Sequence, residues 1–165
     1  RMNLVRLTNA RLYVDGWGFS GQCDEVDIPV LKWTSMEIRN LAIHGKVKAP
    51  LTLEELRTTI KGSFDPALVA LICDPTVFVN LQIRADLTDL GPLGISRGGE
   101  VVAFVRGWAE EINPGTVRGQ QETQGGQYAF HLMSYRLVAA GTELWDVDLL
   151  SGRTVINGNT LFEGE

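Results

Sequence analysis

Residues 77–87 read VFVNLQIRADL, and this stretch decides the fold class of the chain. Every second side chain from Val77 to Leu87 is apolar, whereas the side chains between them are mostly polar. Strict alternation of this kind is typical of a β-strand that buries one face, because successive side chains of a strand point to opposite sides. The run is roughly twice the usual strand length of about 5–6 residues. We therefore predict a long strand here and a mainly β fold.

Three further stretches predict long strands, at residues 101–112, 127–139 and 143–150. Two of them carry apolar side chains on both faces. In the first, Val101, Ala103 and Val105 oppose Val102, Phe104 and Trp108. In the second, one face is expected to hold Ala129, His131, Met133, Tyr135 and Leu137, and the other Tyr128, Phe130, Leu132 and Val138. Extended edges invite pairing with another chain, so assembly of copies is expected; the alternative is a second sheet over one face and a few exposed apolar side chains.

Shorter strands and one helix complete the predicted secondary structure. Strands are expected at residues 11–15, 23–31, 33–39 and 51–62, where a helical stripe also fits, and residues 155–156 add a brief pairing. A helix is expected to begin at Asp65-Pro66, an N-cap followed by a first-position proline, and to end at Asp74-Pro75. The sum is about seven to eight strands in a single domain, residues 1–165, folded as a β-sandwich or open barrel with one short helix. A protruding loop is expected around residues 40–50 and a long hairpin loop around residues 88–99.

The composition excludes several classes of protein. A net charge of −5 argues against general affinity for the nucleic acid backbone. The longest apolar runs, such as residues 67–73, are far shorter than the roughly 20 residues of a membrane-spanning helix. The first residues lack an apolar signal core, so we expect synthesis in the cytoplasm and no membrane insertion by this chain. Cys23 and Cys73 have neither zinc-site nor secreted-disulfide spacing and are expected to be reduced.

The motifs that could indicate catalysis or a cofactor lack the neighbouring residues and elements that such sites need. Residues 16–21 spell GxGxxG, but an alternating segment with Pro29 follows, where a dinucleotide site needs a helix N-terminus. The only two histidines are His44 and His131, and neither has a paired acid and nucleophile nearby in the sequence. We therefore expect no enzyme activity, no cofactor and no metal.

Seven fragments in a fixed order resemble the major tail tube proteins of contractile-tailed phages, a group that also supplies the inner tube of R-type bacteriocins. Each fragment alone is weakly specific, but together they extend over nearly the whole chain. They are LYVDG at 12–16, VDIPVL at 26–31, DP at 65–66, RG at 106–107, PG at 114–115, EL at 143–144 and VING at 155–158.

This resemblance implies a hexameric ring in which the long β-hairpins of six copies form one continuous inner barrel, with the helix outside. Rings would stack into a hollow tube inside a contractile sheath, on a baseplate, with its length set by a tape-measure protein in the lumen. DNA would pass through the lumen without specific binding, and the net negative charge is expected to keep phosphates off the wall. The implied location is the tail tube of a virion assembled in the host bacterial cytoplasm.

Three groups of residues are candidates for roles in such a tube. Alternate residues of the long strands are expected to line the lumen: Asn80, Gln82, Arg84 and Glu110, with Glu100 and Arg106 as neighbours. The basic segment around residues 40–50 is expected to hold rings together through Arg39, His44, Lys46 and Lys48. Subunit contacts along the barrel are expected at Val102, Phe104, Tyr135 and Leu137.

Other functions fit the sequence less well but stay open. The tube could belong to a bacteriocin or another contractile injection system, including a type VI secretion system. A monomeric β-barrel module that binds a ligand is a rival from another class. An enzyme on a β-sandwich is the least favoured, because the chain offers no catalytic constellation.

Overall fold

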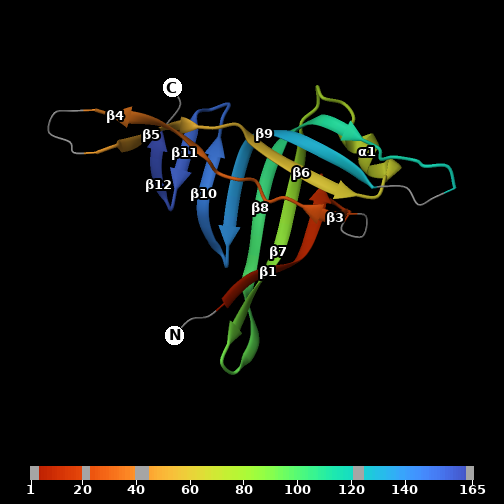
Figure 1. Cartoon of the computed structure of the whole chain (residues 1–165), viewed down its shortest axis with the longest axis horizontal. Coiled ribbons are helices and arrows are strands. Elements are labelled where there is room, and N and C mark those ends of the chain that lie inside the picture. The colour runs from red at the N-terminus through yellow and green to blue at the C-terminus, as the bar shows by residue number, and fades with distance from the viewer. Residues whose placement is uncertain (1–3, 20–22, 40–44, 121–124, 163–165) are drawn as a thin grey trace.

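The computed structural model describes residues 4–19, 23–39, 45–120 and 125–162. Within these residues the chain forms twelve β-strands and one helix (Figure 1), so the predicted mainly β class is confirmed. No helix in this part of the chain is both long and apolar enough to cross a lipid bilayer. The elements are β1 (Leu4–Val14), β2 (Trp17–Gly18), β3 (Cys23–Val26), β4 (Trp33–Ile38), β5 (Val47–Leu53), β6 (Leu56–Gly62), α1 (Pro66–Ile72), β7 (Val79–Gly91), β8 (Gly94–Asn113), β9 (Gly126–Ala139), β10 (Thr142–Asp148), β11 (Arg153–Ile156) and β12 (Asn159–Phe162).

Four long strands, in the order β9-β8-β7-β1, form the centre of one antiparallel sheet. The alternation found in the sequence holds from Val79 onward, since Val79, Leu81 and Ile83 are almost fully buried in the core. Val77 is exposed and precedes the strand, so its placement in the strand was wrong. In β8, Val101, Ala103 and Val105 share one face, as the alternation predicted, and this face is the one buried in the core.

The long hairpin loop expected around residues 88–99 is instead part of two paired strands. β7 continues to Gly91 and β8 begins at Gly94, which pair directly, so only Pro92 and Leu93 connect them. The glycines suggested a loop, but this end of the hairpin is held by backbone pairing and needs no large side chain. Gly94 and Gly99 both have positive φ angles, which glycine adopts without strain.

A β-bulge at Met133 reverses the alternation of β9. Arg106 pairs with Ser134, but Gly107 pairs with Leu132, so Met133 is the extra residue. Tyr135 is therefore on the same side of the sheet as Leu132, and both are fully buried. The predicted division of β9 into two faces was wrong beyond Met133, because a bulge shifts every later side chain to the other face.

The sheet forks at this bulge. The first half of β9 pairs with β6, up to Leu132, and the second half pairs with β10 from Ser134 onward. β3 pairs with β6, whereas β11 and β12 continue the sheet beyond β10. Figure 1 shows β8 and β9 curving between these two parts, with β6 crossing in front of the long strands. One core cluster joins both parts, and within the described residues the sheet is not closed into a barrel.

The other long edge of the sheet belongs to β1. One side of this strand pairs with β7 over most of its length. On the opposite side, β2 pairs only with Tyr13 and Val14, and the Leu12 carbonyl accepts a hydrogen bond from Phe19. Among the described residues, no strand pairs with that side of β1 from Leu4 to Arg11. In the part of the chain that the structure describes, β1 thus has a long open edge.

A separate hairpin, β4–β5, extends from the body of the molecule (Figure 1). Residues 47–50, expected in the protruding loop, belong to β5 and pair with β4. A hydrogen bond of 2.8 Å joins the hydroxyls of Thr34 and Thr52 across the hairpin. Residues 40–44, including His44, lie outside the described residues.

The predicted helix is confirmed, while the strand expected at residues 23–31 is shorter. Asp65 caps α1 by accepting a hydrogen bond of 3.0 Å from the Ala67 amide, and Leu68 and Ile72 bury one side of the helix. β3 ends at Val26, three residues before Pro29, which has no backbone N–H to donate to a strand ladder. The Pro29 carbonyl instead accepts a hydrogen bond of 2.9 Å from the Tyr135 hydroxyl.

Candidate functional site

The sheet carries a polar face on the side opposite the core. Its side chains come from alternate positions of β1, β7, β8 and β9, and the Met133 bulge brings the last two of them to this side. We call this set the polar face: Arg11, Tyr13, Asn80, Gln82, Arg84, Asp86, Glu100, Val102, Phe104, Arg106, Ser134 and Arg136.

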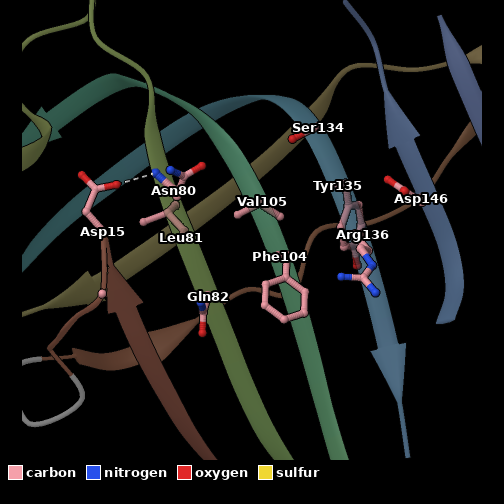
Figure 2. A pocket seen from close by; sticks show the side chains of 11 residues that line it. Asp15, Asn80, Leu81, Gln82, Phe104, Val105, Ser134, Tyr135, Arg136 and Asp146 are labelled. Carbon is pink, nitrogen blue, oxygen red and sulfur yellow. Dashed lines mark hydrogen bonds between the residues drawn. The ribbon is translucent and has the colours of Figure 1, made fainter. Parts of the chain in front are cut away.

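A hollow of about 580 Å³ lies on the polar face, over β7, β8 and β9. Figure 2 shows Asn80, Gln82, Phe104 and Arg136 along three neighbouring strands, with Asp146 of β10 at the margin. At the other margin the Asp15 carboxylate accepts a hydrogen bond of 3.0 Å from the backbone N–H of Asn80. The hollow is open and mixed in polarity, as expected of a wall more than of a closed ligand pocket.

Three arginines of this side of the sheet share two carboxylates. The shortest contact joins Arg84 to Glu100 at 2.7 Å, and Arg11 also approaches Glu100 at 3.5 Å. Asp86 pairs with Arg11 at 2.9 Å and with Arg97 at 2.8 Å. Because each guanidinium already faces an anion of the same chain, its attraction for an external phosphate is reduced.

Asn9 supplies an additional contact to Asp86. It lies at the bulge of β1 with a φ of 53°, a left-handed conformation that asparagine adopts more readily than most residues. Its side-chain amide donates a hydrogen bond of 3.2 Å to Asp86. This hydrogen bond is the main cause that lowers the pKa of Asp86, and Arg11 and Arg97 lower it further against the opposing effect of desolvation.

The lowered pKa of Asp86 predicts a loss of stability in acid. The unfolded aspartate has a pKa of about 3.9, so the contribution of Asp86 is fully present above about pH 4 and is lost as the pH falls through the lower folded pKa. Urea unfolding between pH 6 and 2 should show a falling free energy of unfolding for the wild type and a weaker fall for Asp86→Asn. Glu25→Gln is the control, since Glu25 lies 3.9 Å from Lys61 with both side chains exposed. Equal pH profiles for wild type and Asp86→Asn would contradict this prediction.

Three guanidinium groups on this side of the sheet, including that of Arg84, lie over aromatic rings. Arg136 lies 5.4 Å from the centre of the Phe104 ring and also forms an ion pair with Glu143. Arg106 lies 5.8 Å from the Phe78 ring, and Arg84 lies 5.8 Å from the Tyr13 ring. Stacking on an aromatic face offsets part of the positive charge.

The polar face and its margins carry balanced charge. Five arginines and five carboxylates lie here, and Arg153 beyond the margin also approaches Asp146 at 4.0 Å, so this side of the sheet is not the acidic surface that the net charge of the chain suggested. The arginines are Arg11, Arg84, Arg97, Arg106 and Arg136, and the carboxylates are those of Asp15, Asp86, Glu100, Glu143 and Asp146.

The structure brings together most of the residues proposed for the lumen. Asn80, Gln82 and Arg84 lie in a row on β7, and Val102 and Phe104, proposed for subunit contacts, lie beside them on β8. Tyr135 and Leu137, proposed for the same contacts, are instead buried in the core of their own chain. The Tyr135 ring packs edge-on against Trp145, and burial raises the pKa of its hydroxyl well above the ordinary value.

Glu110 lies apart from the other lumen candidates. It is the extra residue of a second bulge, in β8, and it pairs with Arg57 of β6 at 3.0 Å. The His131 ring lies 3.7 Å from Glu110 and 3.1 Å from Glu55. Glu55, Glu110 and His131 are close enough to share a cation, but Arg57 already occupies one oxygen of Glu110.

The ring-stacking candidates that the structure describes lie on or next to the β4–β5 hairpin. Lys48 of β5 pairs in register with Glu37 of β4, and Arg39 approaches the same carboxylate at 3.5 Å. Lys46 is exposed immediately before β5, and His44 lies outside the described residues. Glu37 thus offsets part of the positive charge that the sequence attributed to this segment.

Sequence analysis did not identify two sets of surface residues on the hairpin β7–β8, because this region was interpreted as a loop. Arg97 belongs to the charge network of the polar face, and Leu93 and Ile95 are exposed apolar side chains at the tip. The alternation stops after Leu87, where Thr88, Asp89 and Leu90 follow, so the pattern gave no signal that Arg97 lies on a strand.

Comparisons with known proteins agree with this architecture. The fold is similar to a chain of the sheath–tube complex of an extracellular contractile injection system, PVC, determined in its extended state by cryo-EM. The TM-score is 0.55 at 12% sequence identity, and the match covers 79% of this chain and 88% of that chain. No curated protein matches the sequence. The family described as phage tail tube protein FII matches residues 5–164, and the chain belongs to this family.

Proposed function

We propose that the chain is the inner tube subunit of a contractile phage tail, whose copies close into hexameric rings that stack into a hollow conduit for DNA. The observation that carries this proposal is the open sheet of four long strands, which ends in the long free edge of β1. An unpaired edge of this length favours pairing with another chain. A bacteriocin or another contractile injection system is the alternative, and it is favoured by the injection system among the solved structures of similar fold.

Ring closure requires that the open edge of β1 pairs with the neighbouring copy. Backbone pairing across subunits continues the ladder around the ring, and closure removes the free edges. The polar face then lines the lumen, and α1, on the other side of the molecule, lies outside. Val102 and Phe104 lie on β8 between charged neighbours and two strands from the edge of β1, so on this arrangement they belong to the wall of the lumen and not to the seam.

The paired charges of the polar face suit a conduit for a polyanion. Binding of DNA depends mainly on cations that neutralise phosphates, so arginines already paired with carboxylates contribute little affinity. The Asn80 and Gln82 amides and the stacked Arg136 add a polar, wettable surface. DNA therefore passes without specific binding. A wall of balanced charge gives this result as well as the acidic wall that the net charge suggested.

The remaining partners follow from the same architecture. A contractile sheath surrounds the tube, a baseplate starts its assembly, and a tape-measure protein in the lumen sets its length. The subunit acts as a structural protein of the virion, assembled in the host bacterial cytoplasm, and uses no enzyme activity or cofactor. The whole chain, residues 1–165, acts as one tail tube domain.

The β4–β5 hairpin extends from the body and is proposed to contact the neighbouring ring through Arg39, His44, Lys46 and Lys48. Reversal of Lys46 and Lys48 to Glu should leave the fold intact, because both side chains are exposed. Polymerisation should be lost, since the hairpin, made acidic by the two substitutions, would repel an acidic surface on the neighbouring ring. Sedimentation measures the loss of polymerisation, and circular dichroism checks that the fold is retained. Lys61→Glu with Arg118→Glu is the control for net charge, and normal polymerisation of the Lys46 and Lys48 variant would count against the contact.

Electron microscopy of the purified chain in negative stain, over a range of concentrations, tests the proposed function. Six-membered rings or hollow cylinders support it. A monomer at every concentration would overturn it and would favour a ligand-binding module that uses the hollow of about 580 Å³.

A further inference from the structure

The tip of the β7–β8 hairpin exposes apolar side chains that nothing in the described chain covers. Leu93 is 97% exposed and Ile95 is 73% exposed, and Leu90 beside them is also exposed. The backbone of the tip is satisfied by strand pairing up to Gly91 and Gly94. The tip is therefore an ordered apolar surface, and clustered apolar side chains at one exposed point often mark a contact site.

An apolar groove lies at the opposite end of the molecule. It has a volume of about 270 Å³ and is formed where the β4–β5 hairpin meets the turn between β10 and β11. Its apolar walls are Trp33, Leu51, Leu53 and Leu149. Leu51 and Leu149 are exposed, and Leu150 adds a further exposed leucine next to the groove.

Strand register places the tip and the groove far apart along the same strands. At the groove end, Asp148 pairs with Ser134, which pairs with Arg106, which in turn pairs with Asn80. From Asn80 to the tip at Gly91, β7 advances by eleven residues. At about 3.3 Å per residue this is roughly 35 Å. The tip and the groove consequently lie at opposite ends of the long strands (Figure 1).

We propose that the tip of one copy inserts into the groove of a copy in the next ring. The occupant is a second copy of this chain, because the chain belongs to a tail tube family, and a translation along the long strands brings one end of a copy to the other end of the next. The tip and the groove are different surfaces, so the contact between two copies is head-to-tail. Each copy keeps one free tip or groove, and copies can therefore be added without limit instead of closing into a dimer. This inference rests on the proposed function, since it specifies how the rings stack.

Cross-linking tests the contact directly. Leu93→Cys and Leu149→Cys are combined with Cys73→Ser, since Cys73 is exposed; Cys23 is left in place because burial raises the pKa of its thiol to about 11. After assembly, a short bis-maleimide should join the tip of each copy to the groove of the next. A denaturing gel should show a ladder of two, three, four and more chains. The variants with only one new cysteine are the controls and should give no ladder.

Each result has a distinct meaning. A ladder supports head-to-tail insertion, whereas a product that stops at dimers, or no product from well-formed tubes, overturns the inference and leaves the proposed function intact. Absence of rings and tubes from the wild type would overturn both.

A second variant covers the case in which the cysteine variant fails to assemble. Leu93→Asp should keep the fold and the rings but shorten or abolish tubes, because the charge cannot enter the apolar groove. Val117→Asp is the matched control, as Val117 is 76% exposed and lies at neither end of the contact. Full-length tubes of Leu93→Asp would overturn the proposal.

Discussion

Deletion of Met133 is expected to prevent folding of the chain. Without the bulge residue, the strand after Leu132 shifts by one position, and Tyr135 and Leu137 turn from the core to the polar face. Loss of one large buried side chain from a core costs about 2–5 kcal/mol, and a whole domain is stable by only about 5–15 kcal/mol. Ser134 and Arg136 would at the same time turn toward the core. The expected result is an insoluble or unfolded product, checked by solubility and circular dichroism.

The substitution Met133→Ala is the control for this deletion. It keeps the number of residues in β9, and Met133 is only partly buried, so the fold should be retained with a modest loss of stability. A soluble deletion variant that unfolds like the wild type would show that the bulge does not determine which side chains of β9 face the core.

The substitution Gly107→Ala is expected to cause the second large loss of stability. An added Cβ at Gly107 would lie 1.9 Å from the His131 carbonyl oxygen and 2.9 Å from the Leu132 Cα. Both are backbone atoms of the neighbouring strand, so relief requires that β8 and β9 separate next to the bulge. Overpacking of this kind typically costs about 1–3 kcal/mol, and the upper end or more is expected here because no flexible side chain can give way. Urea unfolding measures the loss.

Gly18→Ala is the matched control for Gly107→Ala. A Cβ at Gly18 would lie 3.5 Å from the Tyr13 ring, an ordinary contact. Its free energy of unfolding should change much less than that of Gly107→Ala. If both variants unfold at the same urea concentration, the close approach of β8 and β9 is not important for stability.

The bulge at Met133 explains why sequence analysis found the long strands but not all of their faces. Alternation from Val79 to Ile83 and from Val101 to Val105 could be extended correctly because each run contains no extra residue. No residue type marks Met133 as a bulge, so period-two counting placed Tyr135 on the wrong side. Similarly, the glycines of residues 88–99 suggested a loop, although the paired backbone continues to Gly91.

The candidate site could be predicted only in part for a related reason. Asn80, Gln82 and Arg84 share one strand, and their common face follows from the alternation alone. The contact of Arg11 with Asp86 joins residues 75 positions apart, and it depends on the pairing of β1 with β7. The RG fragment at residues 106–107 was recognised from the resemblance alone. The structure adds the physical reason for a glycine at position 107, which is the close approach of the β9 backbone.

Cryo-EM of assembled tubes is the most direct test of the claim that copies complete the open sheet and enclose the polar face. The account predicts a ring in which β1 of each copy pairs with its neighbour, and a lumen lined by Asn80, Gln82, Arg84 and Arg136. A map in which the polar face points away from the lumen, or in which β1 remains unpaired between copies, would contradict it.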